Sequence, residues 1–248
     1  MDFKDHFSGV ARGYGEARPT YPSALARWLG DLAPARGLAL ECGCGSGQLT
    51  RTLAHAFARV VATDASAKQV AAAPTIANVE WRAAPAEASG LPDGSADLVV
   101  AAQAAHWFDL PRFYAEARRV GAPGAALALI AYGRFFVAPE IDAAVAAYYD
   151  GALGAFWPPE RVHPETGYRD LPFPFARIAA PAFSLAAEWD LARTLGYFDT
   201  WSATVALKRA KGDDAPKPFY DAISRAWGDP SAVRAFAWPV TVLAARLG

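Results

Sequence analysis

One stretch, LALECGCGSGQLTRTLAHAFARVVATD at residues 38–64, constrains the fold more than any other part of the chain. An apolar run ends at Glu41, a second apolar run ends at Asp64, and the segment between them carries apolar side chains at helical spacing. Glycines at alternate positions separate the first run from that segment. The order strand, glycine turn, helix, strand predicts a β-α-β unit with two parallel strands.

The same alternation continues as far as residue 132. Further buried strands are expected at NVEWRA, DLVVAA and AALALIAY, and amphipathic helices at YPSALARWLGDLA and LPRFYAEARRVG. Pro22 suits the first position of the former helix, and Asp109 suits the N-cap of the latter. We therefore expect an α/β, Rossmann-like fold in which helices cover both faces of a mostly parallel sheet.

The regular alternation of strands and helices stops after Gly133. EIDAAVAAYYDGAL is expected to be helical, and the proline- and aromatic-rich run FWPPERVHPETGYRDLPFPF predicts an inserted lid over the C-terminal ends of the strands. EWDLARTLGYFDTWSA and KPFYDAISRAW are expected to be helices, and AFAWPVTVLAARL a closing antiparallel strand in which Pro239 favours the sheet edge. The chain is expected to form one domain, 1–248, with an N-terminal cap segment and helix at 1–37, a ligand-binding core at 38–132, the lid at 133–187 and the completion of the sheet at 188–248.

The composition narrows the expected partners. The formal net charge is -1, neither sign forms a long run, and 53% of the residues are apolar. A small molecule is the expected partner, because a nucleic acid requires a basic face and no stretch is apolar enough to cross a membrane. The first ten residues lack the apolar core of a secretion signal, so a cytoplasmic location is expected. The oligomeric state is left open.

The two cysteines, Cys42 and Cys44, both lie in the glycine-rich turn. Their spacing suits neither a disulfide nor a closed metal cage, so small thiols that fill space beside glycine are expected. The histidines outside the later motifs, His6, His55 and His163, lack metal-ligand spacing, and no metal site is expected.

A glycine turn between a strand and a helix brings a ligand close to the backbone and to free N–H groups. A dinucleotide fingerprint would need its third glycine where Gln48 stands, and a P-loop would need a lysine followed by serine or threonine. Glu41 followed by Gly43, Gly45 and Gly47 instead resembles motif I of the class I S-adenosylmethionine-dependent methyltransferases. The resemblance implies S-adenosylmethionine as the cofactor.

The resemblance extends to later strand ends. Asp64 would accept the ribose hydroxyls, and Gln103 would line the methionine arm of the cofactor. The block AEASGLPDGSADLVV is similar to the type 11 methyltransferase domain, but Pro85 stands where a polar residue usually reaches the adenine amino group. The backbone of Ala86 or the carboxylate of Glu87 is the expected substitute.

Two further elements, YGEARPTYP and QAAHWFD, resemble trans-aconitate methyltransferase-like proteins, in which the first element folds over the cofactor. Tyr14 and Arg18 would then hold the methionine carboxylate, and Ala65 and Gln69 would flank the adenine. The full set of expected cofactor-binding residues is Tyr14, Arg18, Glu41, Gly43, Cys44, Gly45, Gly47, Gln48, Asp64, Ala65, Gln69, Ala86, Glu87 and Gln103.

Three residues, His106, Trp107 and Tyr132, are candidates for the methyl-transfer site. His106 follows the fourth expected strand, where ligands of open parallel sheets bind, and its imidazole would act as a base or hold a substrate oxygen. The alternative is a boundary histidine packed beside Trp107. The cations expected to orient a carboxylate are Arg134, Arg161 and Arg169.

The expected function is S-adenosylmethionine-dependent methyl transfer to a small-molecule acceptor, and the trans-aconitate likeness favours O-methylation of a carboxylic acid. Such an acceptor needs no base, because it is ionised at neutral pH. Two alternatives stay open. One is a cofactor-binding protein without turnover that acts as a sensor or partner subunit, and the other is a nicotinamide-dependent oxidoreductase, which needs the other glycine spacing.

Overall fold

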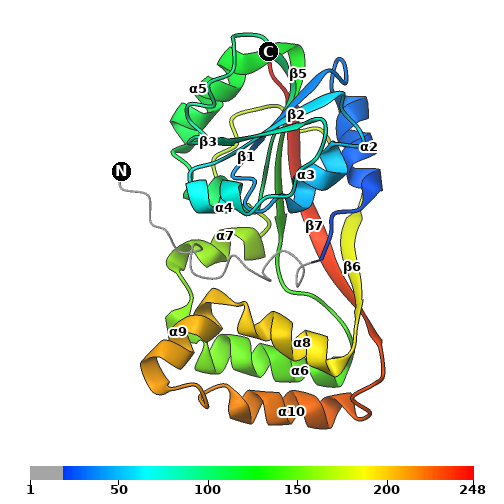
Figure 1. The fold of residues 1–248 in the computed structure, drawn as a ribbon, viewed down its shortest axis with the longest axis vertical. Helices are drawn as coiled ribbons and strands as arrows, with labels where there is room; N and C mark the ends of the chain where they lie inside the picture. The colour runs from blue at the N-terminus through cyan, green and yellow to red at the C-terminus, as the bar shows by residue number, and fades with distance from the viewer. Residues whose placement is uncertain (1–18) are drawn as a thin grey trace.

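The computed structural model describes residues 19–248, so the expected contacts of Tyr14 and Arg18 lie outside the described residues. Within these residues the chain forms one seven-stranded sheet, whose parallel strands lie in the upper half of the molecule in Figure 1. Its strands are β1 (Leu38–Cys42), β2 (Arg59–Asp64), β3 (Val79–Ala83), β4 (Ala96–Ala102), β5 (Gly121–Tyr132), β6 (Phe183–Trp189) and β7 (Arg234–Arg246). Their order is β3-β2-β1-β4-β5-β7-β6; β1 to β5 are parallel, and β7 is antiparallel to both of its neighbours. The expected Rossmann-like α/β fold is confirmed.

Helices cover both faces of this sheet, because the central strands are buried on both sides. The elements that flank it are α2 (Ser23–Leu32), α3 (Gln48–Leu53), α4 (Ala67–Ala71) and α5 (Leu110–Val120). Leu98 and Val100 of β4 belong to the apolar cluster that contains α2 and α3, whereas Val99 belongs to the cluster that contains α5. Asp109 is the N-cap of α5, as expected, and accepts a hydrogen bond from the Arg112 backbone N–H at 3.3 Å.

A second layer of helices lies beyond the C-terminal ends of β1 to β5 (Figure 1). This helical layer comprises α6 (Pro139–Ala147), a π-helical turn (Tyr148–Ala152), α8 (Leu191–Asp199), α9 (Ser202–Lys211) and α10 (Lys217–Trp227). The short helix α7 (Val162–Glu165) stands between the layer and the sheet. Phe135, after β5, packs its ring against Phe198 of α8 and against Trp238 of β7. The helical layer and one face of the sheet therefore share one apolar cluster.

The C-terminal third differs from the sequence-based expectation in two elements. Residues 183–189 form strand β6, although Glu188 and Trp189 were expected to begin a helix, and that helix is divided into α8 and α9. Phe183, Leu185, Ala187 and Trp189 do alternate as a strand requires. Alanine and glutamate between them favour a helix, and this local preference concealed the strand. The expected boundary between residues 187 and 188 therefore falls inside strand β6, and the helices α8 to α10 that follow lie with α6.

Strand β7 closes the sheet antiparallel to β5, as expected, but it is not the edge strand, because β6 pairs along its other side. Pro239 is tolerated there for a local reason. Ala237 exchanges both backbone hydrogen bonds with Phe136, so Pro239, two residues further on, faces the same side. Pairing with β5 has ended at Val240, and the missing N–H of Pro239 therefore breaks no ladder bond.

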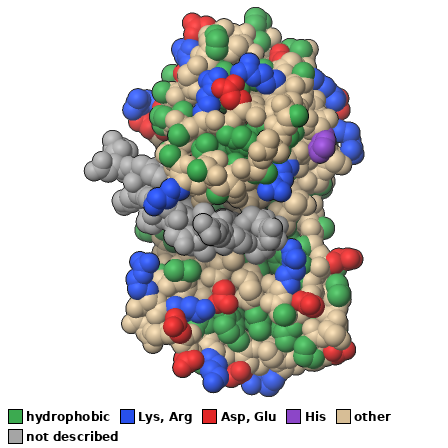
Figure 2. Space-filling view, in the orientation of Figure 1, with side chains coloured by type: hydrophobic (Ala, Val, Ile, Leu, Met, Phe, Trp, Pro, Cys, Tyr) green, Lys and Arg blue, Asp and Glu red, His purple; other side chains and the backbone are tan. Residues whose placement is uncertain are grey.

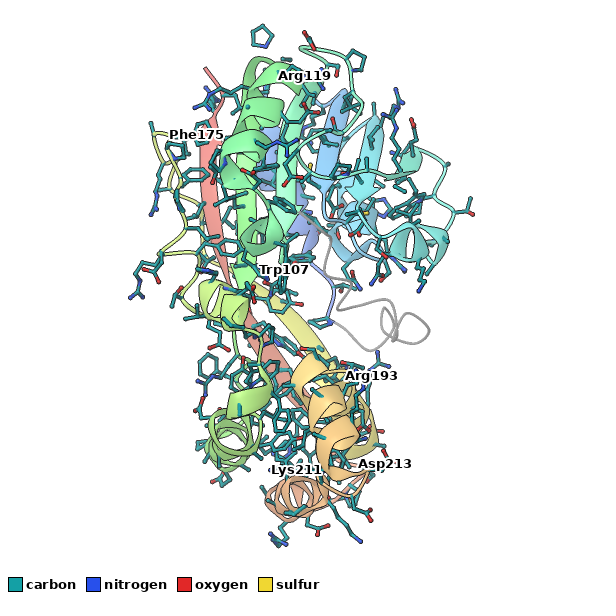
Figure 3. The ribbon with its side chains drawn as sticks, turned by 90° about the vertical axis from the view of Figure 1, so that its left-hand side faces the viewer. Trp107, Arg119, Phe175, Arg193, Lys211 and Asp213 are labelled. Atoms are coloured by element: carbon teal, nitrogen blue, oxygen red, sulfur yellow. The ribbon has the colours of Figure 1, made fainter. Side chains whose placement is uncertain are left out.

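The expected lid at 133–187 covers two different surfaces. Its first half joins the helical layer, whereas the run from residue 168 to 178 lies against α5 and the sheet. There Tyr114 donates a hydrogen bond from its hydroxyl to the Pro172 carbonyl at 2.6 Å, and the Arg118 guanidinium lies 4.5 Å from the ring centre of Phe175. Figure 3 shows Phe175 beside the sheet half of the molecule, far from the helical layer. The part of the expected lid that contains Pro172 and Phe175 therefore does not face the strand ends.

Acidic and basic side chains are interspersed over both halves of the molecule on the face drawn in Figure 2, with no large area of one sign. This mixture agrees with the formal net charge of -1. Within residues 19–248, no helix has the length and apolar character needed to cross a membrane.

Candidate functional site

The three glycines after β1 adopt left-handed backbone conformations, with φ values of 69°, 54° and 90° at Gly43, Gly45 and Gly47. A Cβ at Gly43 would lie 2.4 Å from the Cβ of Ala104, and one at Gly47 would lie 2.4 Å from the Trp81 ring. A Cβ at Gly45 would meet nothing within 4 Å. The outer glycines are thus needed for packing, and Gly45 presents bare backbone to open space, where a ligand can approach.

Asp64 at the end of β2 is held against this turn. Its two carboxylate oxygens each accept a 2.8 Å hydrogen bond, one from the Gly45 N–H and the other from the Ser66 N–H. Ser66 is the N-cap of α4, so Asp64 does not serve as that cap. Each oxygen keeps acceptor capacity, because a carboxylate oxygen has two lone pairs. Asp64 is therefore placed and oriented to accept hydroxyl groups beside Gly45.

Glu41 lies beneath the turn, with 1% of its surface exposed. Its carboxyl group accepts a 2.5 Å hydrogen bond from the Thr50 hydroxyl, which ties β1 to α3. Burial raises the pKa of Glu41 to about 8, the Thr50 hydrogen bond opposes this shift, and the charge of Asp64 adds to it. The side chain faces Thr50, so contact with the methionine part of the cofactor stays a prediction.

Gln103 follows β4 in an unusual conformation, with φ at 54°, which is rare for a residue other than glycine. Its side-chain amide donates a 2.7 Å hydrogen bond to the carbonyl of Tyr132. Its Oε1 is buried and has no hydrogen-bond partner among the described residues. Such an orphaned acceptor fits the amino group of a cofactor's methionine arm, because a buried acceptor without a partner is costly. This observation, together with the bare backbone at Gly45, fits S-adenosylmethionine.

The residues expected around the adenine have mixed surroundings. Ala65 is exposed and Gln69 is buried, whereas Ala86 is buried in the cluster that contains α5. Glu87 accepts a 2.8 Å hydrogen bond from the Asp109 backbone N–H through Oε1, which anchors the start of α5. A structural role accounts for that oxygen, and the adenine contact of Glu87 stays a prediction.

The remaining turn residues are accounted for by packing. Cys42 and Cys44 are buried free thiols, as expected for small side chains that fill space. Burial raises the pKa of both, that of Cys42 to about 12, so neither is a reactive thiolate at neutral pH. Gln48 donates a 3.1 Å hydrogen bond from its amide to the Ser46 hydroxyl. Its contact with the cofactor stays a prediction.

The candidate methyl-transfer residues lie where the sheet meets the helical layer. His106 and Trp107 form a short turn after β4, with ring centres 4.9 Å apart, and Figure 3 shows Trp107 at this junction. Tyr132 ends β5 and packs edge to face on Tyr21 at 6.2 Å. Burial lowers the pKa of His106 to about 3, and the nearby Arg161 guanidinium and His163 ring add to this shift. Its imidazole is therefore neutral and weakly basic at physiological pH.

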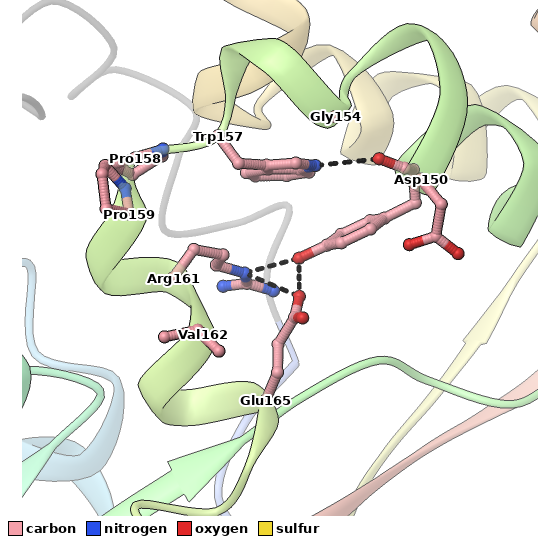
Figure 4. Close-up of a pocket in the computed structure, with 9 residues that line it drawn as sticks. Asp150, Gly154, Trp157, Pro158, Pro159, Arg161, Val162 and Glu165 are labelled. Atoms are coloured by element: carbon pink, nitrogen blue, oxygen red, sulfur yellow. Dashed lines mark hydrogen bonds and ion pairs between the residues drawn. The ribbon is translucent and has the colours of Figure 1, made fainter. Parts of the chain in front are cut away.

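Beside this junction lies a cavity of about 320 Å³. Its walls include Tyr149 and Trp157, whose rings stack at 4.4 Å, and the Arg161 guanidinium, which lies 5.3 Å from the Trp157 ring centre. Arg161 donates a 2.7 Å hydrogen bond to the Tyr149 hydroxyl, and that hydroxyl donates to Glu165 (Figure 4). Burial raises the pKa of Glu165. The wall of the cavity thus combines two stacked aromatic rings with Arg161, which forms an ion pair with Glu165 at 3.4 Å, and with Asp150.

Of the other arginines proposed for a carboxylate, Arg134 is paired with an acid, as Arg161 is. Arg134 makes two 3.0 Å hydrogen bonds to Asp150, and Arg169 is exposed. Tyr168 belongs to the proline- and aromatic-rich run and was not among the expected site residues, but its hydroxyl lies 3.2 Å from His106 Nδ1. No local pattern predicts this contact, because 62 residues separate the two. Among the described residues, no group of three potential metal ligands occurs.

Comparison with known proteins shows to which family the chain belongs. The methyltransferase domain family matches residues 40–129. A protein of Dictyostelium discoideum named as a methyltransferase is 33% identical over 229 residues, which cover 91% of this chain and 87% of that protein.

A solved structure from Anaeromyxobacter dehalogenans, described as a type II methyltransferase, is 49% identical with a TM-score of 0.88, over 93% of this chain and 98% of that one. An uncharacterised methyltransferase of Mycobacterium tuberculosis is 36% identical over 134 residues, about half of each chain at 52% and 53%. The chain belongs to the class I S-adenosylmethionine-dependent methyltransferases, and S-adenosylmethionine is its cofactor.

Proposed function

We propose that this methyltransferase acts on a small organic acid and methylates a carboxylate oxygen. The observation that carries the proposal is the aromatic setting of His106, which follows β4 at the strand ends and packs against the rings of Trp107 and Tyr168. Its pKa of about 3 makes it a weak base, which is poorly suited to deprotonate an alcohol or a phenol. A carboxylate acceptor is ionised at neutral pH and requires no base.

The surroundings of His106 support an anionic acceptor. The charge of Arg161 acts on His106, so the guanidinium lies near the methyl-transfer region. Arg161 also forms part of the wall of the 320 Å³ cavity, next to Tyr149 and Trp157. An arginine held against aromatic rings is restrained in position, and its planar head matches a carboxylate. We expect the cavity to hold the body of the acid and Arg161 to orient its carboxylate.

The proposed reaction is a direct displacement. S-adenosylmethionine supplies an activated methyl group when bound. A lone pair of the carboxylate oxygen forms the new bond to the methyl carbon, while the C–S bond breaks and its electron pair stays on sulfur. No proton moves in this step. The residues of the chain contribute by orienting the acid and by excluding water, and alignment of two reactants can contribute about 7 to 11 kcal/mol in favourable cases.

The test uses S-adenosylmethionine labelled in its methyl group and a panel of small carboxylic acids, phenols and amines. We expect label in the acids, in a form that mild base releases as methanol, because a methyl ester is base-labile. Arg161→Gln should raise the KM for the acid by roughly 10- to 100-fold, because a hydrogen bond to a charged group contributes about 1.5 to 3 kcal/mol. Arg169→Gln is the matched control, since Arg169 is exposed.

Base-stable label on phenols or amines alone would contradict the carboxylate proposal. Binding of S-adenosylhomocysteine without transfer to any compound of a broad panel would favour a cofactor-binding sensor or partner subunit. The likeness to trans-aconitate methyltransferase-like proteins makes small acids with several carboxylates the first to try.

A further inference from the structure

Tyr168 is a fully buried tyrosine whose hydroxyl lies at the methyl-transfer region. It follows the short helix α7 in a left-handed conformation, with φ at 58°, directly after Gly167 at 63°. Bulky residues rarely adopt this conformation, so the surrounding structure must hold it there. The conformation directs the phenol hydroxyl to within 3.2 Å of Nδ1 of His106. Packing thus fixes one partner of the histidine.

The direction of this hydrogen bond follows from the burial of the phenol. Tyr168 is fully buried, so the proton of its hydroxyl needs an acceptor within the structure. The described partner is His106 Nδ1, so the hydroxyl donates to Nδ1.

In a neutral imidazole one ring nitrogen is a donor and the other an acceptor. If Nδ1 accepts from Tyr168, the ring proton must be on Nε2. The opposite arrangement, with the proton on Nδ1, would leave the proton of the buried phenol without this acceptor.

We propose that Tyr168 holds His106 in the Nε2-protonated tautomer, so that His106 donates a hydrogen bond to the acceptor substrate and does not act as a base. Tyr168 is then a positioning residue for His106. The identity of the bound group, a carboxylate oxygen, rests on the proposed function, whereas the tautomer does not. A donor at Nε2 would hold one carboxylate oxygen and leave the other for methylation.

The charges around His106 agree with a neutral donor. Arg161 and His163, both from the segment that leads to Tyr168, oppose protonation of the ring. Trp107 and Tyr168 present aromatic rings at 4.9 Å and 5.9 Å between centres. No carboxylate among the described residues acts on the pKa of His106, so none favours an imidazolium.

The first experiment measures the tautomer directly. Nitrogen-15 NMR of the full chain labelled at histidine distinguishes Nε2–H, Nδ1–H and imidazolium, and the His106 signals are those lost in His106→Gln. We expect a neutral ring with Nε2–H from pH 5 to pH 8, without any acceptor present. An Nδ1–H ring, or protonation near the ordinary pKa of 6.5, would overturn the proposal. This wild-type measurement does not depend on whether any variant folds or on the identity of the acceptor.

The second experiment separates a donor from a base. The glutamine amide N–H approximates the position of Nε2–H, whereas asparagine places its amide near Nδ1. With whichever acceptor takes the label, His106→Gln should stay within about fivefold of wild-type kcat/KM, and His106→Asn should lose roughly 10- to 100-fold. Equal and large losses in both variants would indicate a base.

Tyr168→Phe should lower kcat/KM by roughly tenfold, leave the affinity for S-adenosylhomocysteine unchanged, and release His106 into a mixture of tautomers. Tyr114→Phe is the matched control, because Tyr114 is also a buried tyrosine, and its hydroxyl donates to the Pro172 carbonyl on the α5 side. A Tyr168→Phe protein that retains pure Nε2–H would show that Tyr168 does not set the tautomer.

Discussion

Glu41 and His106 carry pKa shifts in opposite directions for the same physical reason. Burial disfavours the charged form of either group, so the pKa of the acid rises to about 8 and that of the histidine falls to about 3. The two shifts have opposite consequences for stability. The Glu41 shift destabilises the folded chain increasingly as pH rises from about 4.5 to 8, and the His106 shift destabilises it as pH falls below 6.5.

Substitution of Glu41 by glutamine isolates the first effect. Glu41→Gln keeps an acceptor for the Thr50 hydroxyl but cannot ionise. Between pH 4.5 and 8 the folded wild type binds a proton that the unfolded chain does not, so wild-type stability falls relative to the variant, by up to about 1.4 kcal/mol per pH unit. Urea unfolding at pH 5 and pH 8.5 measures this difference. If wild type and Glu41→Gln differed in unfolding free energy by the same amount at both pH values, a buried, protonated Glu41 would be contradicted. The contribution of His106 is the same in both proteins and does not affect this difference.

The expected contact of Asp64 with the cofactor can be tested with Asp97 as the matched control. Asp64→Ala should weaken S-adenosylhomocysteine binding by roughly tenfold or more, because charge-assisted hydrogen bonds to hydroxyls contribute about 1.5 to 3 kcal/mol. Asp97 likewise accepts two backbone N–H groups, of Gly37 and Leu38, but at the opposite end of β1. Isothermal titration calorimetry should find Asp97→Ala unchanged in affinity. An unchanged affinity in Asp64→Ala would remove Asp64 from the site.

At the scale of elements, the glycines of the turn between β1 and α3 have different roles: Gly43 is needed for packing, and Gly45 is expected to face the ligand. Gly43→Ala would bring a Cβ to 2.4 Å from Ala104, whereas Gly45→Ala would meet no atom within 4 Å. Both positions have positive φ, so each substitution carries backbone strain of about 1 to 2 kcal/mol. Gly43→Ala should lose further stability, by about 1 to 3 kcal/mol, because the backbone must move.

Gly45→Ala should instead lose affinity for S-adenosylhomocysteine, by about tenfold, because its methyl group occupies the space that the ligand approaches. Thermal unfolding and calorimetric titration of the two variants provide the comparison. If Gly45→Ala binds as tightly as wild type, the open backbone at this position does not contact the cofactor.

At the scale of the whole molecule, the sheet and the helical layer share an aromatic cluster, so we expect them to unfold together. Phe135→Ala should destabilise the chain by about 3 to 5 kcal/mol, since its ring packs against rings of α8 and β7. Phe136→Ala, next in the chain and 59% exposed, should change stability by less than about 0.5 kcal/mol.

Far-UV circular dichroism and tryptophan fluorescence should each report the same single unfolding transition in Phe135→Ala and in Phe136→Ala. A separate early transition of the helical layer, whose helices include α8 and α10, would divide the chain into two folding units and contradict the expected single domain.

The sequence by itself determined the features that depend on local order along the chain. The alternation of strands and helices up to Tyr132, the glycine turn after Glu41, the acid at Asp64 and the cap at Asp109 all depend on residues within one or two elements of each other. For such features periodicity and turn chemistry are sufficient. The family followed from these features, because they lie at consecutive strand ends that parallel topology brings to one edge.

Only the tertiary structure decided how distant segments meet. Strand β6 depends on pairing with β7, which overrides the helical preference of its alanines. Tyr168 contacts His106 although 62 residues separate them in the sequence. Arg161, which lies in the same segment as Tyr168, lowers the pKa of His106. The physical reason is the same in each case: a contact between segments far apart in the chain is set by packing of the whole molecule, and neither residue carries a local signal of its partner.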